Sequence, residues 1–347
     1  APNLRFPEFH GEWEKCKFKD VCSTSTGNKN TQDKIDDGIY PFYVRSQTVE
    51  RINSWTFDGE AILTAGDGVG VGKVFHHTYG KIGVHQRVYI LSNFKCDANY
   101  LFHFFSSHFY NRVKRMSAKN SVDSVRKEMI TEMPLYLPSK QEQAKIGVLL
   151  SLLDERIATQ SKVIDKLQSL IRGIAHKISK QGKPNIRLSE CLECSSTTLQ
   201  ESDVAEVGAY PVYGANGIVG YLDTYSTTKE AIYIIKDGSG VGSVSYVKGK
   251  CSATGTLNIL QAKEGYSLRY LYFMLKVFNF EPYKTGMAIP HIYFKDYRKA
   301  KIYCPSYELQ VKYTDLLFGI EQKAITEQKI LTNLYNQKQY LLRQMFI

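Results

Sequence analysis

Two glycine-rich segments have the spacing best suited to hold an anion against the backbone. Residues 67–74 read DGVGVGKV and residues 237–244 read DGSGVGSV. A nucleotide phosphate loop needs a glycine five residues before its Gly-Lys pair and a serine or threonine after it, but Asp67 and Val74 occupy those positions. The dinucleotide pattern GxGxxG also fails, because the third glycine comes one residue early in both segments. We interpret both as tight hairpins between strands, where the backbone can approach a ligand such as a nucleic-acid phosphate. A purely structural turn is an equal alternative.

Other segments that resemble catalytic motifs lack the rest of the chemistry. Phe280–Tyr283 is only superficially like the short motif of adenine methyltransferases, and no glycine-rich cofactor loop follows a strand in the right context. Glu327–Lys329 is a Glu-x-Lys of a nuclease type, but on a helix residues i and i+2 point to different faces. We therefore predict no catalytic residue.

The metal-binding side chains do not form a site either. His76, His77 and His291 show no ligand spacing, and Cys191–Cys194 is a lone CxxC, whereas a structural zinc needs four ligands. Seven scattered cysteines indicate reduced thiols and a cytoplasmic protein. We predict no metal and no cofactor on this chain.

Basic and aromatic side chains are the remaining candidates, and they cluster around both glycine-rich segments. Duplex DNA is bound by lysine and arginine on phosphates and read by polar side chains on base edges. The alternative is that these residues are solvated surface charges. The predicted nucleic-acid-binding residues are Arg45, Lys73, His76, His77, Lys81, Arg87, Lys114, Arg115, Lys119, Tyr213, Lys248, Lys250, Lys284, His291, Tyr293 and Lys295.

These clusters occur twice because the sequence contains a repeat with a long period. Residues 38–43 recur at 208–213, the glycine-rich segments recur at the same offset of 170 residues, and residues 135–139 recur at 302–306. Several motifs in constant order indicate two copies of one unit. In each copy, short runs such as 60–64 and 231–235 predict buried strands, and 99–109 and 267–279 predict helices, so the first part of the unit is α+β.

The second part of each copy is a long helix. Apolar residues recur in steps of four and three from Ile146 to Ile178, and the second copy repeats the pattern from Tyr313 to Met345. About 40 residues make a helix of roughly 60 Å, which favours a two-helix coiled coil over a buried core helix. The predicted seam includes Ile157, Gln160, Ile164, Leu167, Ile171, Ala324, Glu327, Leu331 and Leu334.

The direction of the coiled coil follows from the repeat. Equivalent seams pack most simply about a two-fold axis, which makes the helices antiparallel with pseudo-two-fold symmetry. We expect the polar breaks Gln160 and Glu327 to face each other near that axis. The expected boundaries are 1–138 and 181–305 for the two α/β domains and 139–180 and 306–347 for the helices, with a linker at Lys180–Asn185.

Composition limits the class of protein. The 347 residues are 43% hydrophobic and 23% charged, which is typical of a globular chain and excludes a disordered or fibrous one. No apolar run approaches the length of a membrane span, and residues 1–7 lack the apolar core of a signal peptide. The net charge of +11 suggests an anionic partner.

Together these residues resemble the specificity subunit of type I restriction-modification enzymes. The resemblance rests on residues 2–14, on Tyr40–Arg45, on the Asp-Gly-x-Gly hairpins, and on 120–138 and 286–305. Pro138–Gln143 resembles the Pro…Glu-Gln start of the family's conserved helix. The second copy, Pro305–Gln310, keeps the glutamine but has Leu309 where glutamate is expected.

The resemblance implies a non-catalytic DNA-binding subunit of a prokaryotic restriction system. It implies two target recognition domains that each read one half of a bipartite, asymmetric double-stranded DNA site. The helices would set the gap between half-sites, about one helical turn or roughly 34 Å, and dock two DNA methyltransferase (modification) subunits. S-adenosylmethionine and ATP with magnesium would bind only to partner subunits, including restriction subunits that join the complex. DNA methylation of adenine would then be the activity of the complex.

Three alternatives stay open at the level of sequence. One is a stand-alone, sequence-specific DNA-binding protein that needs no partner. The second is an enzyme with an unrecognised nuclease or methyltransferase site. A coiled-coil assembly protein with incidental charge is a third, and it would show no salt-dependent duplex binding.

Overall fold

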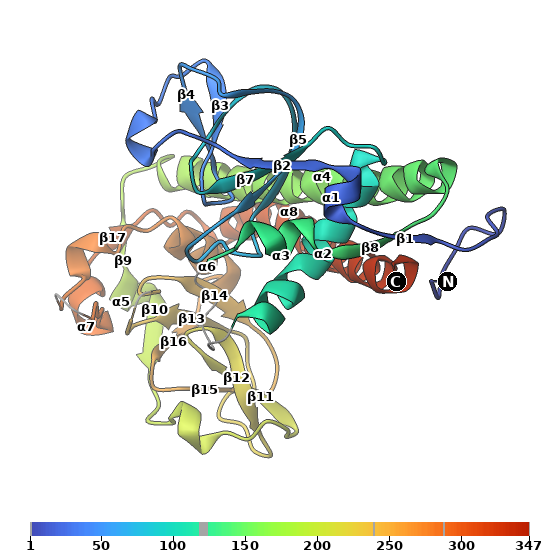
Figure 1. Cartoon of the computed structure of the whole chain (residues 1–347). Helices are drawn as coiled ribbons and strands as arrows, with labels where there is room; N and C mark the ends of the chain where they lie inside the picture. The colour runs from blue at the N-terminus through green and yellow to red at the C-terminus, as the bar shows by residue number, and fades with distance from the viewer. Residues whose placement is uncertain (1, 118–123, 239, 287–288, 347) are drawn as a thin grey trace. The chain divides into compact units, whose positions relative to one another are not determined.

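The computed structural model describes residues 2–117, 124–238, 240–286 and 289–346, and the chain divides into two compact units. Unit 1 consists of Ala1–Gln160 and Ile330–Ile347, and unit 2 consists of Ser161–Lys329. Each unit therefore combines the α/β part of one repeat copy with one segment of each of the two long helices, α4 and α8 (Figure 1).

Unit 1 contains a six-stranded sheet in the order β2-β7-β5-β6-β3-β4 and a separate pair, β1-β8. The strands are β1 (Glu14–Lys17), β2 (Ser23–Thr26), β3 (Tyr40–Tyr43), β4 (Val49–Ile52), β5 (Phe57–Ala65), β6 (Phe75–Val84), β7 (Val88–Ser92) and β8 (Pro134–Leu137). The helices are α1 (Phe18–Val21), η1 (Thr31–Asp33), α2 (Ala98–Met116), α3 (Lys127–Thr131) and the first segment of α4 (Lys140–Ser179).

Unit 2 contains a four-stranded sheet in the order β10-β16-β13-β14, a three-stranded sheet β12-β11-β15 and a pair β17-β9. The strands are β9 (Ile186–Arg187), β10 (Leu192–Ser195), β11 (Tyr210–Gly214), β12 (Gly217–Leu222), β13 (Ala231–Ile235), β14 (Val244–Val247), β15 (Ser252–Ala253), β16 (Leu257–Ala262) and β17 (Lys301–Ile302). The helices are α5 (Leu188–Cys191), η2 (Glu201–Asp203), α6 (Leu268–Lys276), η3 (Glu281–Tyr283), α7 (Phe294–Tyr297) and the first segment of α8 (Tyr307–Met345).

The two units share one strand order, with one local difference. In unit 1 the ten-residue strand β6 pairs antiparallel with β5 and then parallel with β3, which joins all six strands into one sheet. In unit 2 the corresponding stretch is broken into β14 and β15, so the sheet is split in two. The strands and the helix expected at 60–64, 231–235 and 99–109 are confirmed as parts of β5, β13 and α2, and the helix expected at 267–279 is found as the shorter α6, which ends at Lys276.

The long helices pack antiparallel within each unit. In unit 1, Ile146 and Leu150 near the start of α4 share a buried cluster with Leu342 and Met345 near the end of α8. In unit 2, Ile171 and Ile178 of α4 share a buried cluster with Leu317 of α8. The predicted fold, two repeated α/β domains each followed by a long helix, is confirmed.

Burial along the helices follows the heptad spacing. Ile157, Ile164 and Ile171 are buried at seven-residue intervals, as are Ala324 and Leu331, with Glu327 and Leu334 three residues further on. Leu167 and Gln160 are half-buried. Glu327 pairs with Lys323 on its own helix at 2.5 Å. Because Gln160 and Glu327 belong to different units, their facing each other stays a prediction.

A buried glutamine at the start of each long helix fixes the helix to the α/β part of its unit. Gln143 accepts a hydrogen bond from the Asp97 amide (3.0 Å) and donates one to the Pro138 carbonyl (2.8 Å). Gln310 does the same with Ser267 (2.9 Å) and Pro305 (2.9 Å). Asp97 and Ser267 are the N-cap residues of α2 and α6, so each glutamine positions the helix that follows the cap.

The residues before the two glutamines, Glu142 and Leu309, have different surroundings. This difference explains why the second copy lacks the glutamate of the family pattern. Glu142 has no exposed side-chain surface and accepts two hydrogen bonds, at 2.7 and 2.8 Å, from Arg5 of the N-terminal segment. Burial of a carboxylate requires such a partner. Leu309, at the matching position of the second copy, is partly exposed and uncharged, so it needs no such partner.

We predict that Gln143→Leu lowers the free energy of unfolding by about 1–3 kcal/mol, because two buried backbone groups lose their partner. Gln310→Leu has the same effect in unit 2. Gln141→Leu, at an exposed position two residues earlier, serves as the control. Urea unfolding followed by circular dichroism measures the difference. Equal midpoints for the variants at 143 and 141 would contradict this role of the glutamine.

Candidate nucleic-acid interface

The loop at residues 66–74 connects β5 to β6, as expected for a hairpin, and its base is fixed by a carboxylate. Asp67 accepts a hydrogen bond from Arg45 (2.9 Å) and lies 3.7 Å from the Arg87 guanidinium. The Gly66 amide donates to the Arg87 carbonyl at 2.7 Å. Arg45 follows β3 and Arg87 lies between β6 and β7, so Asp67 joins three connections at one end of the sheet.

Further cations of unit 1 lie at the same end. The Lys73 ammonium lies 5.4 Å from the Tyr110 ring of α2, so the C-terminal part of this helix borders the loop. Lys114 and Arg115 follow one turn later and are exposed. His76 contacts the Ser46 carbonyl (3.2 Å), and burial lowers its pKa, which disfavours its charged form.

Two predicted residues of unit 1 lie elsewhere. His77 pairs with Glu60 (3.0 Å) and stacks on Phe102 of α2. Lys81 covers the Trp55 ring at 5.2 Å. Where β5 pairs with β6, the Thr64–Phe75 pair is next to the loop. Lys81 lies opposite Asp58, near the other end of the two strands. Lys119 lies outside the described residues.

In unit 2 the second glycine-rich loop is joined to the segment before α7. The Asp237 carboxylate is 2.7 Å from His291 Nδ1, and the Gly238 amide donates to the Pro290 carbonyl at 3.0 Å. His291 stacks with Tyr293, whose ring lies 5.2 Å from the Lys295 ammonium. Lys284 borders this group, because the adjacent Thr285 exchanges backbone hydrogen bonds with His291.

Two of the remaining predicted residues of unit 2, Lys248 and Lys250, lie at the far end of the β13–β14 hairpin. Lys248 and Lys250 occupy the break between β14 and β15, where Lys250 faces the rings of Tyr210 and Tyr225. Tyr213 packs on Tyr233. The structure therefore brings together only part of the predicted set in each unit.

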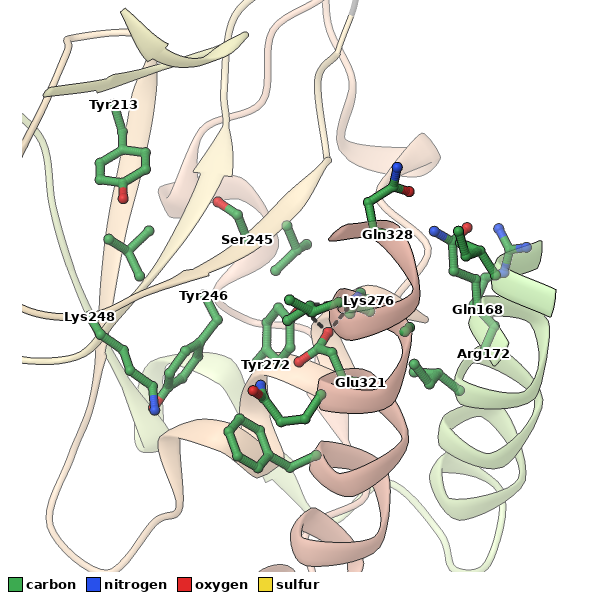
Figure 2. Close-up of a pocket in the computed structure, with 18 residues that line it drawn as sticks. Gln168, Arg172, Tyr213, Ser245, Tyr246, Lys248, Tyr272, Lys276, Glu321 and Gln328 are labelled. Carbon is green, nitrogen blue, oxygen red and sulfur yellow. Dashed lines mark hydrogen bonds and ion pairs between the residues drawn. The ribbon is translucent and has the colours of Figure 1, made fainter. Parts of the chain in front are cut away.

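Lys248 and Tyr213 instead line a cavity of about 730 Å³ in unit 2 (Figure 2). Its walls are β14, α6 and segments of α4 and α8. Within it Glu321 of α8 accepts hydrogen bonds from Tyr272 (2.7 Å) and Lys276 (2.9 Å) of α6. These contacts fix the α/β part of unit 2 to its segment of α8.

Unit 1 has a related contact at the matching position of the other long helix. Asp154 of α4, 167 residues before Glu321, pairs with Lys338 of α8 and lies 3.8 Å from His103 of α2. In the sequence, Lys338 occupies a position of the α8 seam at which an apolar residue is expected. Its ion pair with Asp154 explains why a lysine stands there. Burial of His103 lowers its pKa to about 4.

The anchoring role of the loop carboxylates was not anticipated from the sequence. We expected the cations to be the important residues, but Asp67 and Asp237 determine how the loops are held. Both aspartates open their glycine-rich segments at the same place in the repeat, and this recurrence was the available signal.

No cluster of three metal-binding side chains occurs among the residues that the structure describes. All seven cysteines are unpaired, and burial raises the pKa of the Cys191 thiol to about 12. Among the helices of the described ranges, none combines the length and the apolar character that a membrane span requires.

A family model described as the type I restriction modification DNA specificity domain matches residues 10–169 and again residues 184–336. The chain belongs to this family and carries two copies of its domain. The resemblance drawn from the motifs is therefore confirmed.

Individual relatives agree with this assignment. The specificity subunit of the Escherichia coli type I restriction enzyme EcoDI is 25% identical over 161 residues, which are 46% of this chain and 35% of that subunit. The EcoprrI specificity subunit from the same species is 29% identical over 120 residues, 34% of this chain and 30% of that subunit. The similarity thus spans about a third of the length of these relatives.

A solved structure shares the whole fold. The S subunit of a type I restriction-modification system from M. genitalium superposes with a TM-score of 0.75 at 20% identity. The alignment covers 100% of this chain and 99% of that one. At this identity the likeness concerns the fold.

We predict that acid destabilises unit 1 through His103. The unfolded chain regains an ordinary histidine pKa near 6.5, whereas the folded chain stays neutral down to about 4. The free energy of unfolding therefore falls as the pH drops from about 6.5 to about 4, by up to about 3 kcal/mol. His103→Gln should remove this part of the pH dependence, and His10→Gln, at an exposed position, should keep it. Urea unfolding between pH 7 and pH 4 measures the slope; an unchanged slope in His103→Gln would contradict the assignment.

Proposed function

We propose that this chain is the non-catalytic, DNA-recognising specificity subunit of a type I restriction-modification complex. The observation that carries the proposal is the double match to the specificity domain, over residues 10–169 and 184–336. Each copy presents a glycine-rich loop that is anchored by an aspartate and bordered by cationic side chains. Such surfaces bind DNA phosphates without help from a cofactor.

Each unit would read one half of a bipartite, asymmetric duplex site. The two loops differ in their partners, since Asp67 pairs with arginines and Asp237 with a histidine. Different side chains at the loops would contact different base edges. The long helices would then fix the spacing of the half-sites.

Two modification subunits would dock on the long helices and carry out adenine methylation. S-adenosylmethionine, ATP and magnesium would bind to partner subunits, and restriction subunits would join the same complex. A groove of about 400 Å³ in unit 1, formed by residues of α4 and α8, is a candidate for such docking. Leu152 and Tyr340 in this groove are 58% and 55% exposed, so the groove offers apolar side chains that a partner could cover.

Coexpression with the neighbouring genes, followed by mapping of methylated adenines, tests the proposal. We expect copurification with a methyltransferase and methylation of one asymmetric bipartite sequence. Tight, selective binding by the chain alone with no copurifying enzyme would favour a stand-alone DNA-binding protein. Cleavage or methyl transfer by the pure chain would establish an enzyme.

We predict that replacing Lys73, Lys114 and Arg115 together by glutamine weakens binding to all duplex sequences. Three lost phosphate contacts should reduce the slope of log affinity against log salt by about 2–3. Lys15, Lys81 and Lys95 provide a control of equal charge in unit 1, remote from the loop. Titrations from 50 to 200 mM salt measure both triple variants. Equal slopes in the two would place the loop away from DNA.

We also predict that Leu152→Glu combined with Tyr340→Glu removes one modification subunit. Two carboxylates in an apolar groove oppose burial by a partner. Native mass spectrometry should then show one modification subunit per chain instead of two. Val207→Glu, at a position of unit 2 that is 85% exposed, should keep both. A double variant that still binds two subunits would exclude this groove as the docking site.

A further inference from the structure

The glycine-rich loop of unit 1 holds an apolar side chain in solvent at its tip. Val69 is 98% exposed, although the next valine, Val71, is 2% exposed and packs in the core of the unit. The residue before Val69, Gly68, has a φ of 75°, and no atom lies within 4 Å of where its Cβ would be. The chain thus turns outward at residues 68 and 69 and inward at 71.

The rest of the loop is held firmly. A Cβ on Gly70 would lie 2.5 Å from the Arg45 carbonyl oxygen, and one on Gly72 would lie 2.9 Å from the Tyr110 ring. The Val71 amide donates to the Gly68 carbonyl at 3.1 Å, and the Val74 amide donates to Gly70 at 2.9 Å. Close packing on both sides fixes the position of the tip, so the exposure of Val69 is built into the loop.

The surroundings of Val69 are cationic. Arg45, Lys73 and Arg87 border the loop, and Asp67 is the acid among them, already engaged with both arginines. A single exposed valine is ordinary on a protein surface. A firmly held apolar tip on a loop bordered by three cationic side chains suits an element that enters a groove of DNA.

We infer that Val69 is a specificity-determining residue that contacts the methyl group of a thymine in the major groove. The inference rests on the proposed function and adds which chemical group the first domain reads. In the major groove thymine is the base that presents a methyl group, and apolar side chains recognise it by contact. The surrounding arginines and lysine would hold the adjacent phosphates and so set the position of the tip.

The second copy of the repeat shows which residue can replace Val69 in this motif. At the position equivalent to Val69 the sequence has Ser239, which lies outside the described residues. Val69→Ser therefore places in this loop a side chain that the same motif carries in the second copy. Ile39, 68% exposed at the other end of β3 from Arg45, provides the control Ile39→Ser.

The experiment uses the complex with its modification subunits and a randomised duplex library. The wild-type complex should select a bipartite site, and Val69→Ser should relax the preference at one base pair of one half-site by about fourfold, the value of one methyl group removed from water. Ile39→Ser should select the wild-type site. Unaltered selection by Val69→Ser would overturn the inference while leaving the proposed function intact, whereas a wild-type complex that selects no site would overturn the proposed function itself.

Replacing thymine by deoxyuridine identifies the contact. Deoxyuridine pairs like thymine but lacks the methyl group. At the position that Val69→Ser relaxes, deoxyuridine should weaken wild-type binding about fourfold and leave Val69→Ser binding unchanged. If deoxyuridine at every thymine of the half-site leaves wild-type affinity unchanged, Val69 does not read a thymine methyl group and the inference is wrong.

Discussion

The packing of α8 against α2 is the constraint on which unit 1 depends. Phe346 lies 5.2 Å from the Tyr100 ring and 5.6 Å from the Phe104 ring, and Leu342 and Met345 enter the same buried cluster. These residues are more than 220 positions away from α2 in the sequence. Unit 1 is therefore completed by a segment that follows the whole of unit 2 in the chain. The N-terminal segment joins this contact, because the Leu4 amide donates to the Gln344 carbonyl at 2.9 Å.

A repeated frame supports different surfaces in the two units. Gln143 and Gln310 make the same pair of backbone contacts, and Tyr100 and Tyr270 donate to matching carbonyls at 2.7 and 2.8 Å. Away from this frame the copies diverge. One long strand of unit 1 corresponds to two short strands of unit 2, and the aspartate that opens each loop has different partners. Conserved backbone contacts thus allow variation at the loops without loss of the fold.

The sequence predicted what depends on local pattern and missed what depends on three-dimensional pairing. The repeat, the helices and strands named above and the apolar seam follow from periodicity, and each was found. The grouping of the cations could not be read in this way. His77 and Lys81 are close to Lys73 in sequence, but His77 is engaged with Glu60 and Phe102, and β6 carries Lys81 away from the loop. Arg45 and Lys114 are brought to the loop by other elements. The pairing of Lys338 with Asp154 could not be read from local pattern either, because the two residues are 184 positions apart in the sequence.

Because Phe346 belongs to the buried cluster of unit 1, this unit can be completed only late in the synthesis of the chain. Synthesis at 5–20 residues per second leaves roughly 10–40 s between the emergence of residue 160 and that of residue 346. During this interval the apolar faces of α2 and of the start of α4 have no α8 segment to cover them. Unit 2, whose segments are contiguous from Ser161 to Lys329, has all its parts before unit 1 does. The domain translated first is thus the last to be completed, and an incomplete chain exposes an apolar surface that is a target for chaperones.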